Sequence, residues 1–225
     1  MNPIFVTNFR PFDSSLTTAA ELPPANDRKA LRKTLRKRRQ QLSPLQQKRA
    51  ARNLARILNR SLNVIRARHI AVYLPSDGEI DPQAFISMAR RRGVRFYLPV
   101  LHPIYSGRLV FMPWHSGSRL TANRFGIPEP AFHAQECRPA WALDLVLMPL
   151  VGFDESGGRL GMGGGFYDRT FAFARVRQRL CPTLIGLAHE TQKVPELAMA
   201  SWDIPLDAVV TDRTLYDPRS KEVSQ

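Results

Sequence analysis

The segment LDLVLMPL, residues 143–150, constrains the fold more than any other part of this 225-residue chain. Its residues are apolar apart from Asp144, and they are far fewer than the roughly 18 to 20 that span a bilayer. A short apolar run of this kind is typical of a strand that is buried on both faces, as in a parallel sheet with helices on either side. We therefore expect residues 143–150 to lie at the centre of such a sheet.

Strand and helix patterns alternate on either side of this run. A helix is expected after Asp81 as N-cap and Pro82 as first residue, with Phe85, Met88 and Ala89 facing the core. The other expected elements are strands at 69–75, 94–100, 108–114, 183–188 and 207–211 and a helix at 166–180. This alternation predicts an α/β fold, a three-layer α/β/α arrangement with a mainly parallel sheet.

The N-terminal part of the expected domain is strongly basic. Residues 28–68 hold 15 Lys and Arg and no acid, which leaves a net charge of −1 for the rest of a chain that carries +14. Leu31 and Leu35 begin one helical apolar stripe, and a second stripe runs over 54–65. Ser43 and Pro44 suit the N-cap and the first turn of the second helix. We expect a basic N-terminal helical pair.

The excess charge alone does not identify a partner. Nucleic acid, an anionic lipid surface and a phosphate ligand would each attract a basic helix, and most of the face could simply be solvated. No nucleic-acid motif is recognisable in residues 28–68, and no apolar run spans a membrane. We therefore expect neither nucleic acid nor a membrane as partner.

The domain boundaries follow from the same patterns. Residues 1–27 show no period and are expected to form a flexible extension, 28–215 a single domain and 216–225 a tail. The N-terminus lacks the features of a secretion signal, and Cys137 and Cys181 lack metal-ligand or redox spacing. We expect a cytoplasmic monomer whose cysteines are packing residues.

Glycine is concentrated shortly after the central apolar run. Six of the chain's 13 glycines lie in GGRLGMGGG, residues 157–165. Because glycine costs backbone entropy, this cluster between a strand and a helix indicates close approach to a ligand, and successive N–H groups suit phosphate. The segment matches neither the Walker A nor the dinucleotide motif. The residues alone leave two interpretations, an unusual phosphate site and a flexible glycine turn.

Two charged residues bear on this choice. Arg159 lies within the segment, where its guanidinium could bind phosphate oxygens. Asp168 would repel phosphate unless a cation lay between them, so its position predicts Mg²⁺ that bridges carboxylate and phosphate. The alternative for Asp168 is a first-turn carboxylate that the helix dipole stabilises.

The segment GGRLGMGGGFYDR, residues 157–169, resembles the signature of the 5-formyltetrahydrofolate cyclo-ligase family, also called 5,10-methenyltetrahydrofolate synthetases. The resemblance covers about residues 28–211. It implies a ligase that forms a C–N bond by closing 5-formyltetrahydrofolate to 5,10-methenyltetrahydrofolate, with ATP as co-substrate and Mg²⁺ as cofactor. The supporting motifs are RKALR (28–32), YLPSDGEID (73–81), NRFGIPEP (123–130), LDLVLMPLVGFD (143–154) and PLDAVVT (205–211).

The resemblance also implies the residues of the ATP and metal sites. Arg28 stands where the family usually has Lys, and Phe166 where many relatives have Tyr. Asp168 and Asp207 would hold Mg²⁺, although Asp207 also suits a strand start that is bonded to the backbone. The implied ATP-binding residues are Arg28, Leu31, Arg32, Arg159, Leu160, Gly161, Met162, Gly163, Gly164, Gly165, Phe166 and Tyr167.

Three further residues are implied for the folate. Leu74 and Glu79 match folate-contacting positions, and Phe125 is a candidate aromatic wall. Each also has a structural interpretation: Leu74 as core, Glu79 as a solvated turn residue and Phe125 as packing beneath the Gly-Ile-Pro turn. No catalytic nucleophile or histidine metal set is recognisable. Two rival functions stay open, a nucleic-acid-binding module and a nucleotide-binding regulator.

Overall fold

The structure is a computed structural model that describes residues 22–176 and 181–218. Most of the expected extension and tail, and the end of the helix expected at 166–180, lie outside the described residues. The last sheet strand ends at Tyr216, one residue past the expected domain boundary.

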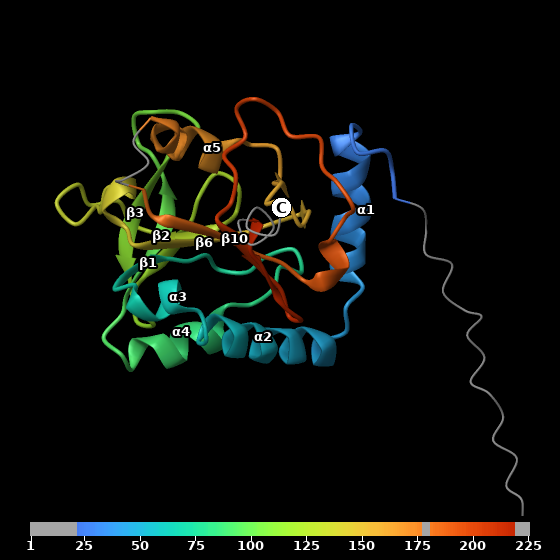
Figure 1. Cartoon of the computed structure of the whole chain (residues 1–225). Helices are drawn as coiled ribbons and strands as arrows, with labels where there is room; N and C mark the ends of the chain where they lie inside the picture. Colours follow the sequence, from blue (N-terminus) through green and yellow to red (C-terminus); the bar gives the residue numbers. More distant parts are fainter. Residues whose placement is uncertain (1–21, 177–180, 219–225) are drawn as a thin grey trace, which may run out of the picture.

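A mainly parallel sheet forms the middle of the molecule (Figure 1). Its order is β11-β10-β9-β6-β1-β2-β3, with β10, β9, β6, β1 and β2 parallel and the two edge strands antiparallel. The central position of β6 confirms the expectation for residues 143–150. The strands are β1 (His69–Ala71), β2 (Arg95–Leu101), β3 (Leu109–Trp114), β6 (Leu145–Pro149), β9 (Thr183–Leu187), β10 (Ala208–Val210) and β11 (Leu215–Tyr216).

Helical elements cover both faces of this sheet, which confirms the three-layer α/β/α fold (Figure 1). Leu145 and Leu147 of β6 pack into the core beneath α2 (Pro44–Leu58) and α4 (Gln83–Arg90). Val146 and Met148 point to the opposite face, since strand side chains alternate, and pack with Phe171 next to α5 (Phe166–Thr170). The 3-10 helix η2 (Ala172–Arg175) follows α5, and α3 (Leu62–Arg66) follows α2.

Two small hairpins and α1 complete the domain. Helix α1 (Arg28–Gln40) buries Leu31 and Leu35 against the hairpin of β7 (Gly152–Phe153) and β8 (Arg159–Leu160). The second hairpin joins β4 (Leu120–Ala122) and β5 (Pro128–Pro130), and short 3-10 helices η1 (Ala140–Ala142) and η4 (Glu190–Gln192) lie in connections. Neither hairpin was expected, because strands of two or three residues show no periodic pattern.

The basic helical pair is confirmed, with one correction. Ser43 caps α2 through a capping box with Gln46, and Pro44 is its first residue. The stripe expected to continue to residue 65 is broken, because α2 ends at Leu58 and α3 begins separately. Leu62 and Ile65 are exposed rather than buried.

Helix α4 begins one residue later than expected. Pro82 occupies the N-cap position, and Asp81 Oδ1 accepts from Gln83 N at 2.8 Å. Phe85 and Ala89 are buried as expected, but Met88 is exposed and its expected core position is wrong.

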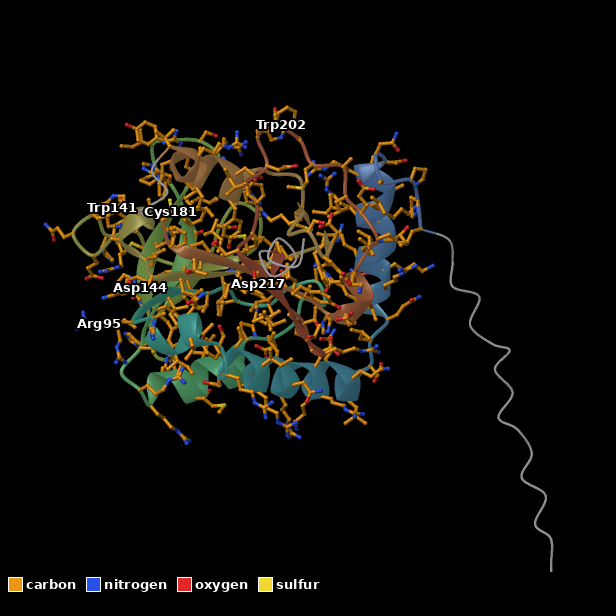
Figure 2. All side chains as sticks on the ribbon, in the orientation of Figure 1. Arg95, Trp141, Asp144, Cys181, Trp202 and Asp217 are labelled. Atoms are coloured by element: carbon orange, nitrogen blue, oxygen red, sulfur yellow. The ribbon has the colours of Figure 1, made fainter. Side chains whose placement is uncertain are left out.

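The carboxyl ends of β1 and β6 face α1. The chain leaves β1 towards β2 on one side and leaves β6 towards β9 on the other, which makes the gap between β1 and β6 a topological switch point. Arg95 and Asp144 mark the opposite, amino-terminal edge (Figure 2). Ligands of α/β sheets bind at the carboxyl edge of such a switch point, so the fold directs the search for a site there.

Candidate functional site

The glycine-rich segment forms two structures rather than one loop. Gly157 and Gly158 lie in the turn of the β7–β8 hairpin, where Asp154 Oδ1 accepts from Ser156 N and Gly158 N at 2.9 Å. A side chain at Gly158 would clash with the Asp154 carboxylate. Only residues 161–165 form an open loop, which leads into α5. The first two glycines are therefore explained by the hairpin, and a ligand has to be sought at the second group.

The open loop presents unused hydrogen-bond donors. Residues 162–164 are exposed, and their backbone N–H groups donate to no other described residue. Gly163 and Gly165 have φ values of +95° and +63°, which side chains disfavour. Consecutive N–H groups in such a loop form a concave site that suits an anion.

Arginines flank this loop on two sides. Arg32 Nε donates to Gly161 O at 2.8 Å, and Arg169 donates to the carbonyl oxygens of Gly107 and Gly164. The following α5 has five residues and gives way to η2, so the long helix expected at 166–180 is wrong within the described residues. Positive charge at the loop therefore comes from arginines rather than from a long helix.

Arg159 and Asp168 bind each other. The Arg159 guanidinium is buried, with an ion pair to Asp168 Oδ1 and a hydrogen bond to Ile204 O. Ile204 N donates to the same Asp168 oxygen at 3.1 Å. In this arrangement Arg159 orients Asp168, and its expected contact with phosphate stays a prediction. Asp168 keeps 20% of its side chain exposed.

The side chains at the glycine loop suit a metal ion that binds together with a phosphate ligand. Mg²⁺ in nucleotide sites is usually held by one or two carboxylates together with phosphates and water. Within the described ranges, no group of three or more His, Cys, Asp or Glu is arranged to hold a metal. Asp168 can supply a carboxylate next to the open loop.

Asp207 lies elsewhere in the fold. It directly precedes β10, and its Oδ2 accepts from Leu184 N at 2.8 Å near the start of β9. This contact matches the alternative of a strand-start residue that is bonded to the backbone. Its role as a metal ligand stays a prediction.

Two of the expected ATP-binding residues are core. Leu31 and Leu160 are each 1% exposed and pack together beneath α1. They set the position of α1 against β8 and do not face solvent. Arg28 lies at the start of the same helix, where its guanidinium is 2.7 Å from Asp203 Oδ2.

Glu79 and Leu74 follow β1 at the carboxyl edge. Glu79 Oε2 accepts from Ser76 N at 3.1 Å, and its Oε1 lies 3.8 Å from the Arg39 guanidinium. Burial raises the pKa of Glu79, while the hydrogen bond from Ser76 and the Arg39 charge oppose this rise. Leu74 is half-buried and packs against the core, consistent with its structural interpretation.

Two of the three expected folate residues, Glu79 and Phe125, lie near the end of the glycine loop. Burial raises the pKa of the Tyr167 hydroxyl, and the charge of Glu79 in the loop after β1 adds to this rise. Phe125 is exposed, and its ring meets the Phe166 ring edge-on at 5.8 Å between centroids. Segments from three parts of the sequence thus converge around residues 161–167.

Comparison with known proteins decides the family. The sequence profile of the 5-formyltetrahydrofolate cyclo-ligase family matches residues 24–212. The chain is 43% identical over 183 residues to the 5-formyltetrahydrofolate cyclo-ligase of Escherichia coli (strain K12), covering 81% of this chain and 99% of that protein. The chain belongs to the 5-formyltetrahydrofolate cyclo-ligase family. Its expected assignment as a ligase is thereby confirmed.

Other cyclo-ligases and solved structures agree with this placement. The enzyme of Haemophilus influenzae is 39% identical, covering 80% of this chain and 94% of that protein. The 5,10-methenyltetrahydrofolate synthetase of Aquifex aeolicus superposes with a TM-score of 0.71 at 27% identity, covering 85% of this chain and 93% of that one. The synthetase of Mycoplasma pneumoniae gives 0.65 at 25% identity, covering 83% and 99%.

Several residues that organise this cyclo-ligase site were missed by sequence reasoning. Asp203 pairs with Arg28, Arg169 bonds the loop to Gly107, and buried Arg39 holds the loop after β1. Arg39 was detectable, because it continues a helical spacing of arginines on α1. Asp203 carried no signal, since its partner Arg28 is distant in sequence. Arg169 ends the recognised motif, but the motif assigned it no contact.

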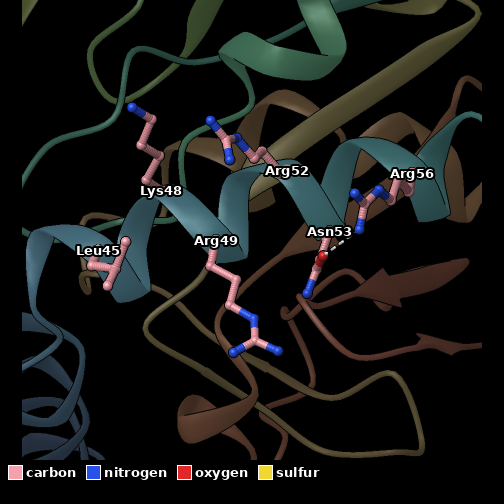
Figure 3. A pocket seen from close by; sticks show the side chains of 6 residues that line it. All are labelled: Leu45, Lys48, Arg49, Arg52, Asn53 and Arg56. Carbon is pink, nitrogen blue, oxygen red and sulfur yellow. Dashed lines mark hydrogen bonds between the residues drawn. The ribbon is translucent and has the colours of Figure 1, made fainter.

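The cations of α2 lie away from the site. Lys48, Arg49, Arg52 and Arg56 project from the outer face of α2 around a shallow cavity of about 410 Å³ (Figure 3). Helix α2 and the glycine loop before α5 lie on opposite sides of the sheet (Figure 1). In the part of the chain that the structure describes, no helix is long and apolar enough to cross a membrane. Cys137 and Cys181 are half-buried and form no disulfide with each other.

Proposed function

We propose that this chain closes 5-formyltetrahydrofolate to 5,10-methenyltetrahydrofolate while it converts ATP to ADP and phosphate. The observation that carries the proposal is the convergence of the open glycine loop, Arg32 and Glu79 at one edge of the sheet. The named relatives support it, since they are 5-formyltetrahydrofolate cyclo-ligases and 5,10-methenyltetrahydrofolate synthetases.

The glycine loop and Arg32 would bind the triphosphate. The unused N–H groups of residues 162–164 provide donors, and Arg32 has guanidinium nitrogens beyond the one that bonds Gly161 O. Arg28 and Arg169 hold the flanks of this site through Asp203 and Gly107. Mg²⁺, when bound with the nucleotide, would neutralise phosphate charge, and Asp168 would hold it with Asp207 as a predicted second ligand.

Glu79 would orient the folate. Its carboxylate is held between Ser76 and Arg39, and it can accept hydrogen bonds from N–H groups of the pterin ring. Leu74 and Phe125 would supply apolar contact. Burial, and after it the charge of Glu79, raises the pKa of the hydroxyl of Tyr167, which follows the glycine loop.

The chemistry requires positioning more than acid-base catalysis. The formyl oxygen of the substrate attacks the γ-phosphorus, and ADP leaves. N10 then adds to the activated formyl carbon, phosphate departs with the former formyl oxygen, and loss of the N10 proton leaves the methenyl bridge. The arginines and loop N–H groups would stabilise the charge that moves between phosphates.

Turnover with Mg²⁺ and ATP tests the proposal directly. The wild-type protein should convert 5-formyltetrahydrofolate to a product with the near-ultraviolet absorbance of the methenyl compound. Asp168→Asn should lower kcat by roughly 100-fold, because a charged group that acts in the transition state is lost. Circular dichroism should show an unchanged fold.

Asp207→Asn is the matched control for the metal assignment. If Asp207 is a second metal ligand, this variant should need a higher Mg²⁺ concentration for turnover. If Asp207 is a strand-start residue, the variant should be less stable but should need the same Mg²⁺ concentration as the wild type. Wild-type kcat and Mg²⁺ dependence in Asp168→Asn would contradict the role of that carboxylate. Absence of product with the wild-type protein would contradict the proposed function.

Cytoplasmic location and a monomeric state stay predictions.

A further inference from the structure

We infer that Arg39 is a positioning residue that sets the folate-orienting Glu79 against the nucleotide loop, through a stripe of arginines along α1. This inference rests on the proposed function of Glu79. Arg39 itself touches neither proposed substrate, and acts through the loop that follows β1.

The stripe is a consequence of helical spacing. Arg28, Arg32, Arg36 and Arg39 are separated by four, four and three residues, which places them along one face of α1. Their contacts run from one loop of the site to the next in order along the helix. Arg28 pairs with Asp203, Arg32 donates to Gly161 O, and Arg36 and Arg39 both bind Asp77. Since α1 is a continuous helix, it fixes the distance between the glycine loop and the loop after β1.

Arg39 is the anchor of this stripe because it is fully buried. Its Nε donates to Asp77 O at 2.8 Å, one terminal nitrogen donates to Leu150 O at 3.0 Å, and the other lies 2.7 Å from Asp77 Oδ2. One side chain therefore ties α1 to the residues that follow both β1 and β6, across the switch point. These contacts use all three nitrogens of a rigid fork, which a lysine ammonium cannot reproduce.

Neighbouring contacts hold the same loop from other sides. Gln47 Nε2 donates to Gly78 O at 3.2 Å, and Asp77 has a positive φ of +51°. His189 is buried beside Gly78, and burial lowers the pKa of its imidazole, which favours the neutral form. The loop is thus locked by contacts from α1, α2 and the chain after β9, and Arg36 and Arg39 of α1 supply the charged ones.

The charge of Arg39 also acts on Glu79 at 3.8 Å. The groups that face Glu79 are Arg39, Asp77, Tyr73 and Tyr167, so Arg39 is the cation among them that lowers its pKa. Removal of this cation leaves burial and the Asp77 charge to raise the Glu79 pKa further. Glu79 would then become protonated at a higher pH than in the wild type.

Steady-state kinetics of three variants test the inference. Arg39→Gln should raise the folate KM by at least about tenfold, as expected when a charged hydrogen-bond partner is lost, with less than about a twofold change in the ATP KM. The acid limb of kcat/KM for folate should move to higher pH. Arg39→Lys should raise the folate KM but leave the acid limb in place, because it keeps the charge. Lys33→Gln is the matched control, since Lys33 is an exposed cation of the same helix outside the arginine stripe and should leave both KM values near wild type.

Two further variants keep the test decisive. If Arg39→Gln does not fold, Asp77→Asn removes the same ion pair and keeps a residue that tolerates positive φ, so it should raise the folate KM alone. Glu79→Gln separates the proposed role of Glu79 in folate binding from the inferred role of Arg39 in positioning it. A raised folate KM in Glu79→Gln with no change in the Arg39 variants would overturn the inference and leave the proposed function standing. No change in Glu79→Gln would instead remove the proposed role of Glu79. Equal rises in folate and ATP KM in Arg39→Gln would show a merely structural role and would also overturn the inference.

Discussion

At the residue scale, the charged groups of the site are held mainly by one another. Arg159 pairs with Asp168, Arg28 with Asp203, and Arg39 with Asp77. The motif indicated which residues gather at the site, but not which way each side chain points, because pairing across the fold depends on tertiary packing. Leu31 and Leu160 show the same limit of prediction from motifs. Both belong to the family's motifs, yet both are buried in the core. Glu79 and Phe125 lie near the end of the glycine loop, and their contacts with folate stay predictions.

Asp77 gives a pH-dependent prediction at this scale. Hydrogen bonds from Arg36 and Arg39 lower its pKa from 3.8 to about 2. A lowered folded-state pKa contributes stability above about pH 4 that is lost as pH falls through about 2. This contribution is about 2 kcal/mol, and Asp77→Asn lacks it at every pH. Urea unfolding at pH 5 and pH 2.5 should therefore show a smaller loss of stability in Asp77→Asn than in the wild type.

The control for this prediction is Glu155→Gln. Glu155 also binds a cation, Lys193, but both partners are more than one third exposed, so the pair should contribute little. Equal pH dependence of unfolding in wild type and Asp77→Asn would disprove the stabilising role of the Asp77 pairs.

At the element scale, periodic signals predicted the helices and the longer strands. Ser43 and Pro44 defined the start of α2, and the apolar run at 143–150 became β6. The β7–β8 and β4–β5 hairpins went unpredicted because strands of two or three residues are stabilised by tertiary contacts and turn residues such as Asp154. The β7–β8 hairpin contains the first two glycines of the glycine-rich segment. The open loop is therefore shorter than the sequence suggested.

Capping of α2 is the prediction at this scale. Ser43 Oγ accepts from Gln46 N, and Gln46 Oε1 accepts from Ser43 N, so Ser43→Ala removes half of a reciprocal cap. Its free energy of unfolding should fall by about 1 kcal/mol, with unchanged turnover. Ser61→Ala is the control, because Ser61 precedes α3 without a side-chain cap bond and should cost less. Equal losses in denaturant unfolding would rule out the capping box as a source of stability.

At the scale of the whole molecule, the strand order places the site and the helices divide the charge. The switch point between β1 and β6 opens towards α1, whose arginines face the loops of the site. The cations of α2 instead line a cavity along that helix (Figure 3), which lies on the other side of the sheet from the glycine loop (Figure 1). The cations behind the net charge of +14 therefore include an arginine stripe at the candidate site and a separate surface on α2, a division that composition could not reveal because it depends on which face each helix buries.

The fate of the formyl oxygen tests the central claim most directly. The proposed reaction transfers this oxygen from the substrate to phosphate, so 5-formyltetrahydrofolate labelled with ¹⁸O in the formyl group should give inorganic phosphate that carries one labelled oxygen per methenyl product. Mass spectrometry of phosphate released in unlabelled water measures this transfer. Unlabelled phosphate, with the label recovered in water, would contradict phosphorylation of the formyl oxygen at this site.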